Sequence, residues 1–297
     1  MEEENSWRRV VTFPLPGRVG KPREYGLTMV MDKGIGLLTT GEILEMAAEY
    51  VDFWKLTFGT SAFYPVKILR EKIKLLRSFG LDVYPGGTFF ELAYFQGKLD
   101  SFLEMALELG FTAVEISDGT VQFNRETRKT VIRQARKLGL KVLSEVGQKQ
   151  AGSTIGFAEI RAAVAEDLKN GAAKVIIEGR EGGKNIGIYG KEGEIVEREM
   201  EKILDQVSEP TCLIWEAPLK KQQQELILRF GPNVNLGNVA PTELLSLEAL
   251  RVGMRSDTMA PSINDGRARR VAQMKTGATP GPAGGAGGVE AAGLNED

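Results

Sequence analysis

The feature that most constrains the fold is a strict alternation of strand-like and helix-like segments through residues 26–251. Short runs rich in Val, Ile and Leu alternate with longer segments in which apolar residues recur at helical spacing. The pairs repeat with a period of about 30 residues, which is the size of one βα unit. The expected strands are 26–32, 51–56, 81–87, 114–118, 142–145, 175–178, 213–217 and 234–237.

Helices are expected between these strands, and several end at a glycine, a common C-terminal stop. Strict βα alternation predicts a parallel sheet, since parallel neighbours need a crossover connection. Eight units favour a closed (β/α)8 TIM barrel of the α/β class over an open doubly wound sheet. No GxGxxG pattern follows the first strand, so a dinucleotide-binding fold has little support. The expected helices are 40–50, 66–79, 98–109, 125–138, 157–170, 196–207, 222–230 and 241–251, with Thr39 or Thr40 as the cap of the first.

The two ends of the chain differ in composition from the expected single-domain barrel, 23–257. Residues 1–22 are polar and broken by proline and glycine, and we expect an extended arm that Trp7 and Phe13 pin to the barrel. Residues 258–297 become a low-complexity stretch of Gly, Pro and Ala from about Gly277, and we expect disorder there. The tail is given no catalytic role.

Composition excludes several classes of chemistry. The 297 residues contain no histidine, which rules out Ser-His-Asp and Cys-His catalysis and His-ligated zinc. The single cysteine, Cys212, lies in an apolar run, so no disulfide framework is expected and a reduced, cytoplasmic location is favoured. The net charge of −2 does not indicate nucleic acid or an anionic membrane as a partner. We see no signal peptide and no membrane span.

Four consecutive expected strands carry a glutamate at or near the C-terminal end. In a barrel these ends share one rim, where the active site lies. A lone charge at a strand end is usually a solvated loop residue, but four carboxylates facing one cavity would repel one another. A divalent cation relieves that repulsion, and with no histidine or thiolate pair we expect Mg²⁺. The predicted metal ligands are Glu115, Glu145, Glu178 and Glu216.

Basic residues near the same rim suit an anionic substrate. Lys55 lies one residue before the end of its strand, and alternation leaves open whether its side chain points into the barrel or outward. The glycine-rich segment 179–190 and the pair Gly237-Asn238 are read either as phosphate-binding loops or as simple flexible loops. The run from Tyr84 to Thr88 is read either as an anion contact or as a plain tight turn.

Several long motifs resemble the phosphosulfolactate synthase family over roughly residues 7–257. They are GLTMVMDKG at 26–34, VYPGGT at 83–88, VEISDG at 114–119 and VLSEVG at 142–147. The resemblance implies a (β/α)8 lyase that joins sulfite to phosphoenolpyruvate with Mg²⁺, giving (2R)-O-phospho-3-sulfolactate. That product leads to coenzyme M in methanogens and toward sulfolactate in some bacteria. Where the family more often has two lysines after Val-Gly, this chain has Gln148-Lys149.

Roles for individual residues follow from joining this chemistry to the strand-end residues. We expect Lys149 to protonate C2 of the adduct, with Lys33 the second candidate, and Lys55 and Arg180 to bind substrate anions. A homo-oligomer acting on small anions is expected. The other expected substrate-binding residues are Asp32, Asp118, Gly237 and Asn238.

Two other functions remain open at this point. One is an aldolase-type barrel in which Lys55 or Lys33 forms a Schiff base with a carbonyl substrate. The other is a barrel without catalysis that acts as a stress-associated or assembly protein, since fold alone does not fix function.

Overall fold

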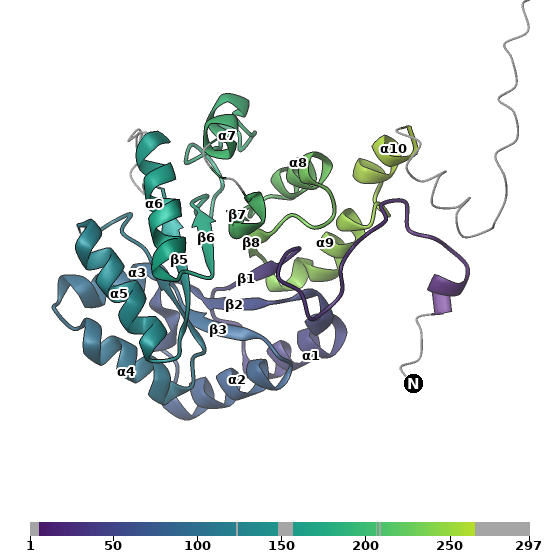
Figure 1. Ribbon diagram of the computed structural model, residues 1–297. Helices are drawn as coiled ribbons and strands as arrows, with labels where there is room; N and C mark the ends of the chain where they lie inside the picture. The colour runs from purple at the N-terminus through teal and green to yellow at the C-terminus, as the bar shows by residue number, and fades with distance from the viewer. Residues whose placement is uncertain (1–5, 123, 148–156, 206, 208, 265–297) are drawn as a thin grey trace, which may run out of the picture.

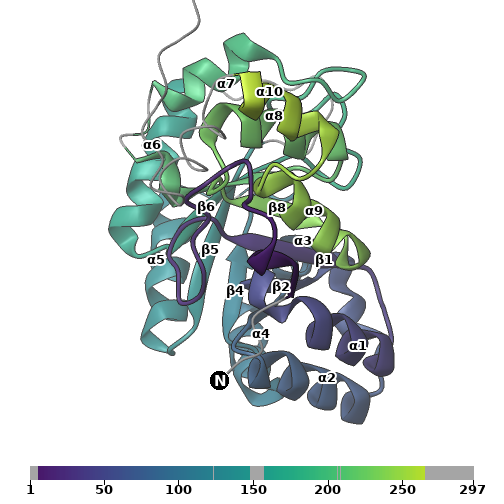
Figure 2. The same ribbon diagram turned by 90° about the vertical axis from the view of Figure 1, so that its right-hand side faces the viewer.

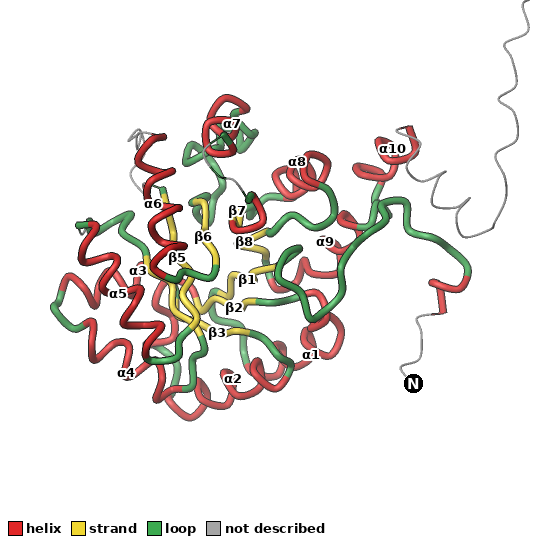
Figure 3. The backbone as a smooth tube through the Cα atoms, in the orientation of Figure 1, coloured by secondary structure: helices red, strands yellow, loops and turns green. Residues whose placement is uncertain are grey.

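The computed structural model describes residues 6–122, 124–147, 157–205, 207 and 209–264. Eight parallel strands form one sheet whose hydrogen-bonded order is β3-β2-β1-β8-β7-β6-β5-β4. In Figure 3 these strands lie at the centre and the helices surround them. The strands are β1 (Thr28–Asp32), β2 (Phe53–Leu56), β3 (Asp82–Pro85), β4 (Ala113–Ile116), β5 (Lys141–Val146), β6 (Lys174–Ile177), β7 (Leu213–Glu216) and β8 (Leu236–Val239).

The two strands at the ends of this order, β3 and β4, nearly close the sheet into a barrel. Between them, Thr112 N donates a hydrogen bond to Val83 O at 3.0 Å. The Thr112 hydroxyl accepts from Val83 N at 2.9 Å. The predicted single-domain (β/α)8 barrel is therefore confirmed.

Helices cover the outside of the barrel (Figure 1). Because both faces of each strand are buried, the strands read as nearly continuous apolar runs. Alternate residues of a strand face the barrel interior, such as Met29, or the helix layer, such as Val30. The helices are α1 (Leu37–Ala47), α2 (Val66–Ser78), α3 (Gly87–Phe95), α4 (Leu99–Leu109), α5 (Arg125–Lys137), α6 (Phe157–Asn170), α7 (Glu197–Leu204), α8 (Lys220–Phe230), α9 (Leu244–Arg251) and α10 (Ser256–Asn264).

Three helical features differ from the sequence prediction. Helix α1 begins at Leu37 with Gly36 as its N-cap, and Thr40 is buried in the first turn, where its hydroxyl donates to Gly36 O at 2.8 Å. Helix α3 was not predicted, because its sequence GTFFELAYF is apolar almost throughout and has no clear amphipathic period. Helix α10 continues the described structure past residue 257, where the barrel was expected to end.

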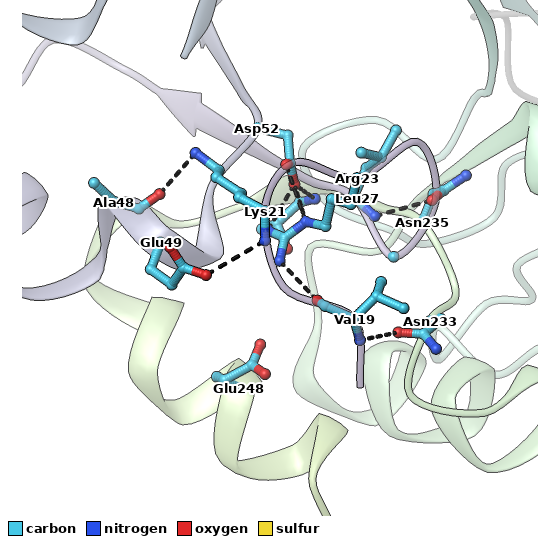
Figure 4. Close-up of polar contacts among 12 residues, drawn as sticks. Val19, Lys21, Arg23, Leu27, Ala48, Glu49, Asp52, Asn233, Asn235 and Glu248 are labelled. Atoms are coloured by element: carbon cyan, nitrogen blue, oxygen red, sulfur yellow. Dashed lines mark hydrogen bonds and ion pairs between the residues drawn. The ribbon is translucent and has the colours of Figure 1, made fainter. Parts of the chain in front are cut away.

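The N-terminal arm is held at the base of the barrel, and Trp7, one of its expected anchors, is 71% exposed. Leu15 is buried instead, and Arg18 forms an ion pair with Glu248 at 3.0 Å. Figure 4 shows the next part of the arm, in which Val19 N donates to the Asn233 side chain and Arg23 forms an ion pair with Asp52. The arm, dark purple in Figure 2, thus crosses the end of the barrel opposite the strand C-termini.

Within the described residues, no helix combines the length and apolar character needed to cross a bilayer.

Candidate active site

The four predicted glutamates all lie inside the barrel and are 1–3% exposed. Each follows an inward-facing apolar residue by two positions, as Glu115 follows Ala113 and Glu145 follows Leu143. The same alternation directs Glu178 and Glu216 inward after Ile176 and Ile214. The four glutamates therefore converge on the interior of the barrel.

Three of the four carboxylates form a tight group. One oxygen from each of Glu145, Glu178 and Glu216 lies within 4.8 Å of the others. Ligands on opposite sides of an octahedral Mg²⁺ stand about 4.2 Å apart, so a small movement of the side chains would bring all three into its shell. Three buried carboxylates are also the hard oxygen donors that such an ion prefers. The donor set therefore fits a divalent cation.

Lys55 points into the barrel and settles the orientation that the sequence left open. Its Nζ lies 2.9 Å from Glu115 Oε2 and 3.1 Å from Glu216 Oε1. Burial alone would lower the pKa of the Lys55 ammonium, but the Glu115 and Glu216 carboxylates outweigh burial and hold this pKa well above its ordinary value. Glu115 is thus joined to the three-carboxylate group through the Lys55 ammonium.

Backbone N–H groups hold two of these carboxylates in position. Gly87 N donates to Glu115 Oε1 at 2.8 Å, and a Cβ at Gly87 would lie 2.4 Å from that oxygen. Gly179 N and Arg180 N both donate to Glu216 Oε2 at 3.0 Å. The paired glycines of the VYPGGT motif therefore permit α3 to begin directly against Glu115.

A further acidic residue at the site, Glu91, was missed by the sequence analysis. It lies on α3, is 1% exposed, and accepts hydrogen bonds from Thr120 N and Val121 N, each at 2.6 Å. The Ser117 hydroxyl lies 2.6 Å from Glu91 Oε1 and 3.0 Å from Glu145 Oε1. A lone charge in the apolar run FFELAYF was the available signal, because such a residue is buried only with partners.

Lys33 and Asp32 are adjacent in sequence but differ in environment. The Lys33 side chain is half exposed and forms an ion pair with Glu181, on the loop after β6. Asp32 faces the helix layer and is fully buried, with its Oδ2 2.5 Å from Nζ of Lys72. The carboxylate of Asp32 thus holds the β1–α1 loop in place, and contact with substrate stays a prediction.

The other expected substrate-binding residues lie around the rim. Asp118 lies 3.1 Å from Arg128; burial raises the pKa of its carboxyl, and Arg128 opposes that rise. The side chain of Arg180 is exposed. Asn238 is buried with φ of 56°, and its Nδ2 donates to Arg180 O at 3.2 Å. Gly237 faces the interior, where a Cβ would lie 2.5 Å from Met29 Cε. Lys149 lies outside the described residues.

The glycine-rich segment after β6 is a packed structure rather than an open lid. Ile186, Ile188 and Tyr189 are buried, and the Tyr189 hydroxyl donates to Glu216 O at 2.6 Å. Gln222 on α8 donates from Nε2 to Gly183 O at 2.6 Å. Since the first N–H groups of the segment bind Glu216, a phosphate role for those two amides would require them to exchange partners.

Comparison with known proteins agrees with this geometry. A family model described as (2R)-phospho-3-sulfolactate synthase (ComA) matches residues 16–257. The phosphosulfolactate synthase of Methanothermobacter thermautotrophicus is 42% identical over 249 residues, covering 83% of this chain and 96% of that protein. The phosphosulfolactate synthase of Methanocaldococcus jannaschii is 44% identical over 237 residues, covering 79% of this chain and 94% of that protein. The phosphosulfolactate synthase of Bacillus subtilis is 37% identical, covering 83% of this chain and 97% of that protein.

The matched region contains the whole barrel and all the acidic residues of its interior. The chain belongs to the (2R)-phospho-3-sulfolactate synthase family.

Proposed function

We propose that this protein catalyses the Mg²⁺-dependent addition of sulfite to phosphoenolpyruvate, giving (2R)-O-phospho-3-sulfolactate. Family membership supports the product. The observation that carries the metal requirement is the buried group of Glu145, Glu178 and Glu216, with one oxygen of each within 4.8 Å of the others.

In this reaction the sulfur of sulfite forms a bond to C3 of phosphoenolpyruvate. The π electrons of the C2–C3 bond move toward C2 and the adjacent carboxylate, and a proton is then added at C2. When bound, Mg²⁺ would supply stabilisation of the negative charge that develops on the substrate carboxylate. Glu145, Glu178 and Glu216 would hold the ion.

Three lysines and one arginine are given roles in this proposal. Lys55 keeps Glu115 and Glu216 in place and, as an ammonium, adds positive charge beside the substrate anions. Lys149 is proposed to protonate C2, with Lys33 as the alternative donor. Substrate phosphate is assigned to Arg180 and to the rim formed by Gly237 and Asn238.

The environment of Lys55 argues against the aldolase alternative in the form that places the Schiff base on Lys55. A Schiff base requires a neutral amine, whereas two carboxylates raise the pKa of the Lys55 ammonium well above its ordinary value. Sulfite addition needs no imine and leaves that charge intact.

Product formation tests the proposal directly. Purified protein is incubated with phosphoenolpyruvate and sulfite, with Mg²⁺ or with EDTA, and the products are followed by ³¹P NMR and mass spectrometry. We expect a sulfonated phosphoester only with Mg²⁺, and a loss of more than about a hundredfold in rate for Glu178→Gln. The matched control is Glu71→Gln, an exposed carboxylate on α2. No product from the wild-type protein with Mg²⁺, or full activity in EDTA, would contradict the proposal.

A further inference from the structure

We propose that the buried ion pair between Lys72 and Asp32 is a positioning unit that holds Lys33 in the orientation needed at the mouth of the barrel. The inference rests on the proposed function, since it gives Lys33 a part in the reaction of phosphoenolpyruvate with sulfite. Lys72 itself touches no substrate.

Lys72 lies on the buried face of α2, where a charge is unusual. It shares that face with Leu69, Ile73 and Leu76, and its side chain is 0% exposed. The spacing 69, 72, 73, 76 is that of an apolar helical stripe, so a lysine within it needs a specific partner. That partner is Asp32, at the C-terminal end of β1.

The ammonium of Lys72 contacts the β1–α1 loop at two points, near its start and near its end. Nζ contacts Asp32 Oδ2 at 2.5 Å and donates to Ile35 O at 2.7 Å. The hydroxyl of Tyr64 lies 3.0 Å from the same carbonyl and 3.1 Å from the ammonium. Trp54 Nε1 donates to Asp32 Oδ2 at 2.9 Å. The three donors, Trp54, Tyr64 and Lys72, come from β2, the segment between β2 and α2, and α2.

Asp32 in turn shapes the backbone that carries Lys33. Its Oδ1 accepts from Gly34 N at 2.7 Å and from Ile35 N at 2.9 Å, which closes a tight Asx-type turn. Lys33 is the residue at the apex of that turn. The Lys33 side chain forms an ion pair with Glu181 on the loop after β6. The first amides of that loop donate to Glu216. The contacts from Lys72 therefore extend through Asp32 and Lys33 to the loop that supplies the amides bound to Glu216.

Stability alone gives a weak reason for such a pair. Taking a lysine and an aspartate out of water is costly, and apolar residues of similar volume often serve a core equally well. A contact that fixes a loop in one geometry explains why Lys72 stands among Leu69, Ile73 and Leu76 with Asp32 as its partner.

A double-mutant cycle tests the inference. The rate of product formation is measured for wild type, Lys33→Met, Lys72→Met and the double variant. Because Lys72 would act through Lys33, the effects should not add. We expect Lys33→Met to lower kcat/KM by about tenfold in the wild-type background and by less than about threefold in the Lys72→Met background.

Tyr64→Phe is a gentler variant should Lys72→Met fail to fold, and it should show the same non-additivity with Lys33→Met to a smaller degree. The control is Asp52→Asn, since Asp52 pairs with Arg23 at 2.9 Å and accepts from Thr28 N at the opposite end of the barrel. In that background the loss caused by Lys33→Met should equal the wild-type loss. Equal losses in all backgrounds, or wild-type kinetics for Lys33→Met, would overturn the inference.

A second measurement is independent of the reaction. The rate at which an amine-reactive acetylating reagent labels Lys33, followed by mass spectrometry, should rise severalfold in Lys72→Met, while labelling of Lys67 on the same helix stays constant. If wild type forms no product, the proposed function fails, and labelling still decides the positioning role. Unchanged labelling of Lys33 would then overturn it.

Discussion

Lys55 is the residue on which the charge balance of the cavity depends. Its ammonium stands between Glu115 and Glu216, and the side chain is 7% exposed. Removing one member of a buried ion pair leaves an uncompensated charge in a medium that solvates it poorly. Lys55 is therefore both a structural and an electrostatic requirement of the site.

We expect Lys55→Met to lower the free energy of unfolding by about 3–5 kcal/mol and to abolish product formation. The folded-state pKa lies above the ordinary 10.5, so the stabilisation is fully present below about pH 10.5 and is lost as pH rises through the folded pKa. Denaturant unfolding should thus show a constant wild-type advantage between pH 7 and 10 that shrinks at higher pH.

Lys220→Met is the matched control for Lys55→Met. Lys220 pairs with Asp257 at 2.6 Å, but its side chain is 48% exposed, and such a pair contributes less than about 1 kcal/mol. Equal effects of the two substitutions on unfolding would contradict the role given to Lys55.

Gly87 is required for steric reasons at the start of α3. A methyl group there would lie 2.4 Å from Glu115 Oε1 and 2.6 Å from Ser117 Cβ. We expect Gly87→Ala to displace Glu115, lower the melting temperature and reduce kcat/KM by about tenfold or more. Gly41→Ala on α1, whose nearest neighbour would be 3.9 Å away, should raise stability by about 0.5–1 kcal/mol and leave kinetics unchanged. Normal activity in Gly87→Ala would count against this account.

At the level of elements, the strands and most helices could be predicted because apolar periodicity and terminal glycines act locally. The convergence of Glu115 and Glu145 with the later glutamates was predicted because the same residue type recurs at the ends of consecutive strands. The direction of the Lys55 side chain could not be predicted, because Trp54 and Leu56 on one face of β2 and Phe53 on the other are all apolar. Both faces of a parallel strand are buried, so polarity does not distinguish inside from outside.

Helix α3 and its Glu91 were unpredictable for a related reason. An apolar segment gives no period, and the contacts that stabilise α3 are with β4 and with the 3-10 helix η3 (Thr57–Ala62), distant in sequence. The burial of Lys72 was not predicted, because a single lysine within the apolar stripe of α2 leaves the helical spacing of that stripe intact. These are tertiary facts, which only the folded arrangement reveals.

The segment 179–196 shows how an element that reads as a flexible loop becomes part of the site. We expect Tyr189→Phe, which removes the hydroxyl bound to Glu216 O, to lower the free energy of unfolding by about 1–2 kcal/mol. Because the segment also supplies the amides that hold Glu216, kcat/KM should fall several-fold. Tyr25→Phe, at a side chain that is 44% exposed, should change neither quantity. Wild-type stability and kinetics in Tyr189→Phe would show that the segment is not anchored through this contact.

At the scale of the whole molecule, the barrel brings together side chains that are 30 to 40 residues apart in sequence. Closed geometry directs the ends of β4, β5, β6 and β7 to one rim, while the N-terminal arm covers the other end. The rim that carries the four glutamates therefore lies at the end of the barrel opposite the N-terminal arm. The central claim is that the rim binds one divalent cation through Glu145, Glu178 and Glu216.

Electron paramagnetic resonance of Mn²⁺, used as a substitute for Mg²⁺, tests that claim most directly. We expect one Mn²⁺ site per chain that Mg²⁺ displaces, with affinity weakened by about tenfold or more in Glu145→Gln, Glu178→Gln and Glu216→Gln. Glu126→Gln, whose side chain is 79% exposed, should bind Mn²⁺ as the wild type does. Absence of a stoichiometric site in the wild type, or unchanged affinity in all three glutamine variants, would contradict it.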